Sequence, residues 1–209
     1  MYVKICGITQ LDQAIAISNL GATALGFICV PGTPRYIKAE TIGAIASQLT
    51  SSIDRVGVFL DAAIAEIHQT VERSNLNAVQ LHGRESIEFC NKLRNILPDV
   101  KLIKAFRIRS NEDLKSVQAY EDWVDYFLLD AYHPQQAGGT GQTIDWTLLK
   151  QFRPNLPWYL AGGLNPDNVL DALAIATPDG IDLSSGLENA PGDKNLERVT
   201  QLFERLKAV

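Results

Sequence analysis

The feature that most constrains this chain is a regular alternation of short apolar runs and amphipathic segments. Eight apolar runs predict buried strands, at 2–6, 24–29, 55–59, 77–81, 101–106, 125–130, 157–161 and 180–184. Eight segments with apolar residues at three- and four-residue intervals predict helices, at 11–20, 39–49, 62–73, 86–97, 112–120, 146–152, 166–176 and 196–206. Strands that alternate with helices in this way pair in parallel.

Eight strand–helix units in 209 residues fit a single (β/α)8 barrel, the TIM barrel with eight parallel strands, better than an open doubly wound sheet. The open sheet remains the alternative. It usually carries a G-x-G-x-x-G turn after the first strand, which the segment Cys6-Gly7-Ile8-Thr9 does not supply. Because the sequence contains no linker or low-complexity stretch, we expect residues 1–209 to form one barrel domain.

Composition narrows the possible partners and the cellular location. The formal net charge is -5, and no run of Lys and Arg forms a basic patch, so we expect no nucleic-acid partner. No apolar stretch reaches membrane-spanning length, and Met1 leads directly into the first strand, which predicts a cytoplasmic protein without a membrane partner. The 3 cysteines, Cys6, Cys29 and Cys90, lack paired metal-ligand spacing and are expected to be reduced thiols.

Polar side chains gather where the predicted strands end, and the carboxyl ends of strands carry the reactive groups in barrels of this type. These polar residues are Cys6, Gln80, His82, Asp130, Asp182 and Ser184. In the first, fourth and sixth strands the opposite parity is apolar, so the polar parity should face the barrel interior. Lys4 shares a face with Cys6, and for it we expect a buried structural ion pair rather than a catalytic role.

Two glycine-rich segments, 160–166 and 183–188, follow the seventh and eighth strands. Glycine lets the main chain approach an anion closely, and barrels often hold a phosphate group at these two loops. We therefore predict a phosphate site formed by Gly162, Gly163, Ser184, Ser185 and Gly186. Simple tight turns are the alternative. A third glycine segment, 137–143, is either a lid over the substrate or a flexible connector.

Several short motifs follow one another along the chain: KICGIT at 4–9, PRY at 34–36, VGVF at 56–59, VQLHG at 79–83, LLD at 128–130, GGTG at 138–141, AGGLNP at 161–166 and DLSSGLE at 182–188. Their order and spacing resemble the N-(5'-phosphoribosyl)anthranilate isomerase family from the first strand to the last helix. Each motif is weak by itself, but the set is specific.

The resemblance implies an aldose–ketose isomerase of tryptophan biosynthesis. Its reaction is the Amadori rearrangement of N-(5-phospho-β-D-ribosyl)anthranilate to 1-(2-carboxyphenylamino)-1-deoxy-D-ribulose 5-phosphate, by general acid–base catalysis. The implied partner is thus a small phosphosugar that carries an anthranilate group, with no cofactor and no metal. The sequence leaves open whether the protein is a monomer or a homodimer.

The resemblance also assigns roles by position. Cys6 is similar to the general base and Asp130 to the general acid, and the substrate-binding candidates are Arg35, Gln80, His82 and Asp182. Arg35 corresponds to the contact for the anthranilate carboxylate. Gln80 and His82 could orient the substrate or support the acid, and Asp182 could bind the sugar or amino group or support the phosphate loop.

The chemistry of the residues agrees with this assignment, because ring opening needs a proton donor and enolamine formation needs a base at C2. A thiol is a poor base unless it is ionised, so we expect the pKa of Cys6 to be lowered, with help from Lys4 or nearby amides. Asp130 must hold a proton, which partial burial would favour. The alternative for Cys6 is an inert buried thiol, which is our expectation for Cys29 and Cys90.

The sequence departs from the family pattern at two places, and three alternative functions can be compared with the resemblance. Residues 29–33 read CVPGT where the family more often has an aromatic residue and a serine, and Asn195 replaces a usual aspartate that caps the last helix. A phosphosugar epimerase would need metal ligands, and an indole-forming synthase would need a catalytic lysine with glutamates at strand ends. A non-catalytic phosphosugar sensor would not need both Cys6 and Asp130.

Overall fold

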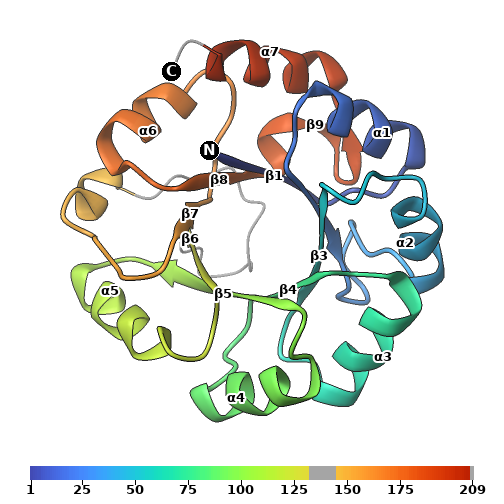
Figure 1. The fold of residues 1–209 in the computed structure, drawn as a ribbon. Helices are drawn as coiled ribbons and strands as arrows, with labels where there is room; N and C mark the ends of the chain where they lie inside the picture. Colours follow the sequence, from blue (N-terminus) through green and yellow to red (C-terminus); the bar gives the residue numbers. More distant parts are fainter. Residues whose placement is uncertain (132–144, 208–209) are drawn as a thin grey trace.

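In the computed structural model, which describes residues 1–131 and 145–207, eight parallel strands close into a barrel in chain order (Figure 1). The strands are β1 (Tyr2–Cys6), β2 (Ala24–Ile28), β3 (Asp54–Phe59), β4 (Ala78–Leu81), β5 (Lys101–Ile108), β6 (Tyr126–Ala131), β7 (Trp158–Leu160) and β8 (Gly180–Leu183). β8 pairs with β1 in a register that places Asp182 opposite Lys4. The predicted (β/α)8 barrel is confirmed, and the open sheet is excluded.

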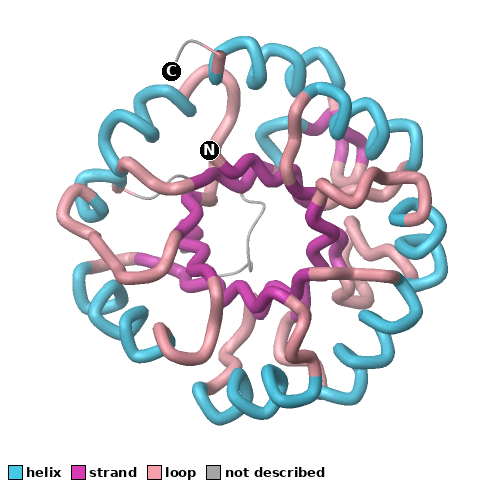
Figure 2. Tube along the Cα trace, viewed as in Figure 1, coloured by secondary structure: helices cyan, strands magenta, loops and turns pink. Residues whose placement is uncertain are grey.

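Helices surround the barrel as a continuous outer ring (Figure 2). They are α1 (Leu11–Leu20), α2 (Ala39–Ala46), α3 (Ile64–Ser74), α4 (Ile87–Ile96), α5 (Asn111–Val117), α6 (Val169–Ala176) and α7 (Leu196–Leu206). Each buries apolar residues spaced three or four apart, such as Val199, Leu202 and Phe203 of α7. The side chain of Asn195 accepts a hydrogen bond from the Arg198 N–H, so this residue caps α7 as predicted.

The alternation of side chains along the strands separates two apolar layers. Ala24, Val56 and Leu128 belong to a small cluster inside the barrel, whereas Val79 and Leu129 belong to the large cluster between the strands and the helices. This is the parity predicted for the first, fourth and sixth strands: the interior faces of β1, β4 and β6 end in polar residues, and the other faces pack against helices. The carboxyl ends of the strands therefore direct Cys6 and Asp130 toward a common mouth.

The amino end of the barrel is filled by tyrosine rings and one buried charge. Tyr2 and Tyr159 stack with ring centroids 4.3 Å apart, and Tyr126 stacks on Tyr159 at 5.2 Å. The Tyr2 hydroxyl donates a hydrogen bond to Asp54, which also pairs with Lys101 at 2.8 Å. This end is packed for stability, so the carboxyl end is left for a binding site.

The structure differs from the sequence prediction at two predicted helices and at one hairpin that was not predicted. The helix predicted at 146–152 is only a 3-10 turn, η2 (Trp146–Leu149), and the N–H groups of Lys150 and Phe152 donate to carbonyls three residues back, not four. The helix predicted from residue 166 begins at Val169, since the Asn165 side chain accepts hydrogen bonds from the Asp167 and Asn168 N–H groups and forms a turn first. A hairpin of β9 (Glu188–Ala190) and β10 (Asp193–Lys194) was not predicted.

Candidate active site

A cavity of about 500 Å³ opens at the carboxyl ends of the strands. All eleven residues that the sequence singled out as site candidates line it: Cys6, Arg35, Gln80, His82, Asp130, Gly162, Gly163, Asp182, Ser184, Ser185 and Gly186. They come from six strand ends and the loops that follow them. The structure thus brings the predicted set together, while the role of each residue remains a prediction.

Cys6 ends β1 with its thiol buried in the cavity wall. Gly26, its partner in β2, leaves the space that the sulfur fills, because a Cβ atom there would lie 2.6 Å from the Cys6 Sγ. Burial raises the pKa of Cys6, although the charges of Lys4 and Lys194 oppose this shift. The expected lowering of the Cys6 pKa is therefore wrong, because loss of hydration outweighs the two cations.

Lys4 forms the structural ion pair that the sequence predicted. Its ammonium lies 2.9 Å from Oδ2 of Asp182, and the lysine side chain is fully buried. Burial by itself would lower the pKa of Lys4, but the charges of Asp182 and Cys6 raise it. The other carboxylate oxygen, Oδ1 of Asp182, is buried and has no hydrogen-bond partner among the described residues. It is available to a ligand in the cavity.

Asp130, His82 and Gln80 form a chain of polar groups across the mouth. Nε2 of His82 lies 3.4 Å from Oδ2 of Asp130, and Nδ1 of His82 is hydrogen-bonded to Nε2 of Gln80 at 2.9 Å. All three side chains are buried or nearly so. Nε2 of His82 forms no hydrogen bond with a described residue, so both predicted roles of His82 and Gln80, support of the acid and orientation of the substrate, fit this geometry. Oε1 of Gln80 has no partner among the described residues and could contact a ligand.

The glycine-rich loops after β7 and β8 pack directly against each other. Gly162 and Gly163 have φ angles of 89° and 65°, a backbone conformation that residues other than glycine rarely adopt. A Cβ atom on Gly186 would collide with the backbone oxygen of Leu164. Asn168 fixes the first loop by donating a hydrogen bond to the Gly163 carbonyl at 3.0 Å. The conformation and contact of these loops require glycine, which fits both the predicted phosphate site and the alternative of tight turns.

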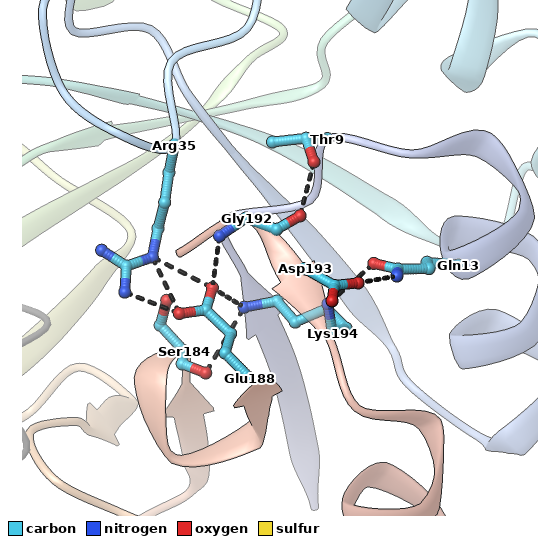
Figure 3. Close-up of polar contacts among 8 residues, drawn as sticks. All are labelled: Thr9, Gln13, Arg35, Ser184, Glu188, Gly192, Asp193 and Lys194. Atoms are coloured by element: carbon cyan, nitrogen blue, oxygen red, sulfur yellow. Dashed lines mark hydrogen bonds and ion pairs between the residues drawn. The ribbon is translucent and has the colours of Figure 1, made fainter. Parts of the chain in front are cut away.

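Arg35 reaches the cavity from the segment after β2, and its guanidinium pairs with Glu188 (Figure 3). Lys194 pairs with the same carboxylate at 2.7 Å. Sequence analysis missed Glu188 and Lys194 as site residues. Glu188 ends the DLSSGLE motif and carried a weak signal, but Lys194 carried none, because only the unpredicted hairpin brings it to the carboxylate.

An apolar wall lines the remaining side of the cavity and was also missed. It consists of Ile28, Val30, Pro34, Val58 and Leu60. Its residues lie at or just after the apolar ends of the second and third predicted strands, where an apolar side chain of a binding site cannot be distinguished by type from one of the core. The departing loop 29–33 contributes to this wall, so its sequence bears on the shape of the site.

The other thiols behave as expected for inert cysteines. Cys29 and Cys90 are free and buried, and burial raises the pKa of Cys29 to about 12 and that of Cys90 to about 11.

The candidate lid at 137–143 lies outside the described residues. Within the described ranges, no cluster of three or more His, Cys, Asp or Glu side chains could hold a metal ion. Among the same residues, no helix is long and apolar enough to cross a membrane.

Comparisons with known proteins agree with the geometry. The family model for N-(5'-phosphoribosyl)anthranilate isomerase matches residues 3–205. Relatives of that name from Trichormus variabilis and Nostoc punctiforme are 58% and 57% identical, each over 99% of this chain and 98% of the relative. The crystal structure of phosphoribosyl anthranilate isomerase from Thermotoga maritima is 36% identical, with a TM-score of 0.91 and complete coverage of both chains.

A solved 3-hexulose-6-phosphate synthase from Salmonella typhimurium has a TM-score of 0.71 at only 14% identity, which shows a shared fold alone. The family match, by contrast, extends over almost the whole sequence at high identity. This chain belongs to the N-(5'-phosphoribosyl)anthranilate isomerase family.

Proposed function

We propose that this chain catalyses the Amadori rearrangement of N-(5-phospho-β-D-ribosyl)anthranilate to the corresponding aminoketose phosphate, a step of tryptophan biosynthesis. One observation carries the proposal: a thiol and a carboxyl group, Cys6 and Asp130, face one cavity that also contains the two glycine loops and Arg35. A solved phosphoribosyl anthranilate isomerase, 34% identical with a TM-score of 0.85, is in complex with reduced 1-(o-carboxyphenylamino)-1-deoxyribulose 5-phosphate.

The cavity has a matching group for each part of such a ligand. The loops that contain Gly162 and Gly186 take the phosphate, because their backbone can approach it closely. The apolar wall around Val58 packs against the aromatic ring, and Arg35 pairs with the carboxylate of the ring. The sugar then lies between Cys6 and Asp130, near Oδ1 of Asp182, which has no hydrogen-bond partner in the described part of the chain.

The first step opens the ribose ring. Asp130 donates its proton to the ring oxygen, the bond between that oxygen and C1 breaks, and the nitrogen lone pair forms a double bond to C1. The product is a protonated imine with a free hydroxyl at C4. His82, at 3.4 Å from Oδ2, stands beside the carboxylate that Asp130 becomes and stabilises it.

The second step moves the proton from C2. Cys6 acts as a thiolate and accepts this proton, while the C–H electrons form a double bond between C1 and C2 and neutralise the nitrogen. The resulting enolamine tautomerises to the ketone as C1 takes up a proton and the C2 hydroxyl loses one. Lys4 and Lys194 favour the thiolate electrostatically, and this is the form that the buried Cys6 must reach for the reaction to occur.

The direct test is an assay with purified protein and freshly prepared phosphoribosylanthranilate, followed by loss of the substrate's fluorescence. The expected result is a decay far faster than the spontaneous one, with a product that keeps the mass of the substrate, as an isomer must, and that reacts as a ketone. The unchanged spontaneous rate would contradict the proposal and would favour a phosphosugar sensor. Hydrolysis to anthranilate and ribose 5-phosphate would contradict it as well.

A further inference from the structure

Arg35 belongs to a cluster of three charged groups, together with the buried side chains of Glu188 and Lys194. Nε of Arg35 shares its one hydrogen between the two carboxylate oxygens of Glu188, at 3.0 and 3.1 Å, and Nη2 donates to Oε2 at 2.6 Å. Glu188 also accepts from the ammonium of Lys194 at 2.7 Å and from the Gly192 N–H at 3.2 Å. Figure 3 shows its carboxylate between the guanidinium and the ammonium. The side chain of Glu188 is only 4% exposed, and that of Lys194 is not exposed.

The cluster fixes one edge of the Arg35 guanidinium and leaves the other edge available for a ligand. Nε and Nη2 of Arg35 are turned toward Glu188, whereas Arg35 lines the cavity and Glu188 does not. Gly7 makes this pose possible, because a Cβ atom there would lie 2.7 Å from Cδ of Arg35. The remaining donors of Arg35, on Nη1 and the outer side of Nη2, are therefore the ones available to a ligand.

The charges of the cluster do not balance. Two cations, Arg35 and Lys194, share one carboxylate, so the group carries a surplus positive charge when both are protonated. Burial lowers the pKa of Lys194, and the charge of Glu188 opposes this shift. Burial would raise the pKa of Glu188, but the bonds from Arg35 and Lys194 lower it, so the carboxylate is ionised at neutral pH. A ligand carboxylate against Arg35 would neutralise the surplus.

We propose that Glu188, anchored by Lys194, is a positioning residue that sets the orientation in which Arg35 receives the carboxylate of the substrate's aromatic ring. This inference rests on the proposed function. A guanidinium on a flexible stem loses rotamer freedom when it binds, and Glu188 imposes that loss before the ligand arrives. Glu188 therefore strengthens recognition of the carboxylate without touching the substrate.

The competing explanation is that the cluster only fastens the β9–β10 hairpin to the barrel. In that case a change at Glu188 would weaken every ligand alike or lower stability without selective loss. The chain offers a matched control at Asp193, a carboxylate of the same hairpin that bonds to Gln13 and Asn189 instead of Arg35 (Figure 3). Glu188→Gln and Asp193→Asn make the same chemical change on the same hairpin.

The experiment measures binding of two ligands by calorimetry: reduced 1-(o-carboxyphenylamino)-1-deoxyribulose 5-phosphate, and the same molecule with an unsubstituted phenyl ring. Glu188→Gln should weaken the carboxylated ligand by about tenfold and the phenyl ligand by less than about twofold. Asp193→Asn should change neither. In Arg35→Ala, which has already lost the contact, the added Glu188→Gln change should have no further selective effect.

In turnover, Glu188→Gln should raise KM more than it lowers kcat. Equal weakening of both ligands, or no change in either, would overturn the inference. If Glu188→Gln does not fold, Glu188→Asp carries the same comparison, because it keeps the charge but shortens the reach to Arg35. If the wild-type protein neither turns over substrate nor distinguishes the two ligands, the proposed function is at fault. If it does both and Glu188→Gln still distinguishes them fully, only this inference fails.

Discussion

Cys6 is a base in the proposed mechanism, yet its surroundings favour the protonated thiol. Its thiol is buried, and burial raises its pKa against the pull of Lys4 and Lys194. Loss of hydration and the two cations thus shift the pKa of Cys6 in opposite directions, and the loss of hydration is the larger effect. The reactive thiolate is therefore a minor form at neutral pH.

This raised pKa predicts how fast iodoacetamide alkylates Cys6 at different pH values. Only the thiolate reacts, and below the thiol pKa its fraction grows about tenfold per pH unit. The alkylation rate at Cys6, followed by peptide mass spectrometry, should therefore keep rising from neutral pH to beyond the ordinary thiol value of 9.0. A rate that is already constant near neutral pH would show an ionised thiol and would restore the expectation from sequence.

Gly26 predicts a second effect at the same sulfur. A methyl group in Gly26→Ala would lie 2.6 Å from Sγ and 3.0 Å from Cα of Cys6, so the thiol must move. A displacement of about 1 Å at a reacting group lowers kcat by about a hundredfold, with a smaller effect on KM. Steady-state kinetics beside an unfolding curve checks this. Wild-type kcat in the folded variant would show that the position of Cys6 is not critical.

The sequence was most informative at the scale of single residues. Strand parity placed Cys6 and Asp130 on the interior face, and the structure puts all eleven candidates around one cavity. Parity says which face a side chain is on but not which charge lies beside it. The pKa of Cys6 and the link from Glu188 to Arg35 depend on contacts between distant segments, and neither could be obtained from spacing.

At the scale of elements, long amphipathic helices and buried strands were predicted well, since their periodicity spans many residues. The short elements were not. η2 and the β9–β10 hairpin occupy four residues or fewer in each segment, too few to show a period. The hairpin matters most, because Lys194 and Pro191 reach the site only through it.

The contact between the β7 and β8 loops predicts an effect on phosphate binding. In Gly186→Ala the new methyl group would strike the backbone oxygen of Leu164 and separate the loops. Overpacking of this kind costs about 1–3 kcal/mol, so we expect KM and the inhibition constant of inorganic phosphate to rise by about tenfold. Inhibition measurements on the folded variant test this. An unchanged inhibition constant of inorganic phosphate would contradict phosphate binding at these loops.

At the scale of the whole molecule, the barrel closes where β8 meets β1, and the pair of Lys4 and Asp182 lies across that seam. Removal of one partner leaves a buried charge without compensation. Lys4→Met should therefore lower the free energy of unfolding by about 3 kcal/mol. In the double variant with Asp182→Asn, part of this loss should return. Urea unfolding checks both, and a single variant as stable as wild type would contradict the role of the pair at the seam.

The eight-fold alternation was sufficient to predict the closed barrel, because few other arrangements bury eight parallel strands and cover them with helices. It also located the mouth, since all parallel strands end on the same side. The family match over residues 3–205 then adds the reaction class, which no fold can supply by itself.

The central claim is that Cys6 and Asp130 transfer the protons of the rearrangement across this mouth. The measurement that tests it most directly is kcat for Cys6→Ser and Asp130→Asn, taken beside the affinity of each variant for the reduced product analogue. We expect kcat to fall by about a thousandfold in each, with the affinity within about threefold of wild type. A folded variant with near-normal kcat would remove its residue from the mechanism and contradict the account.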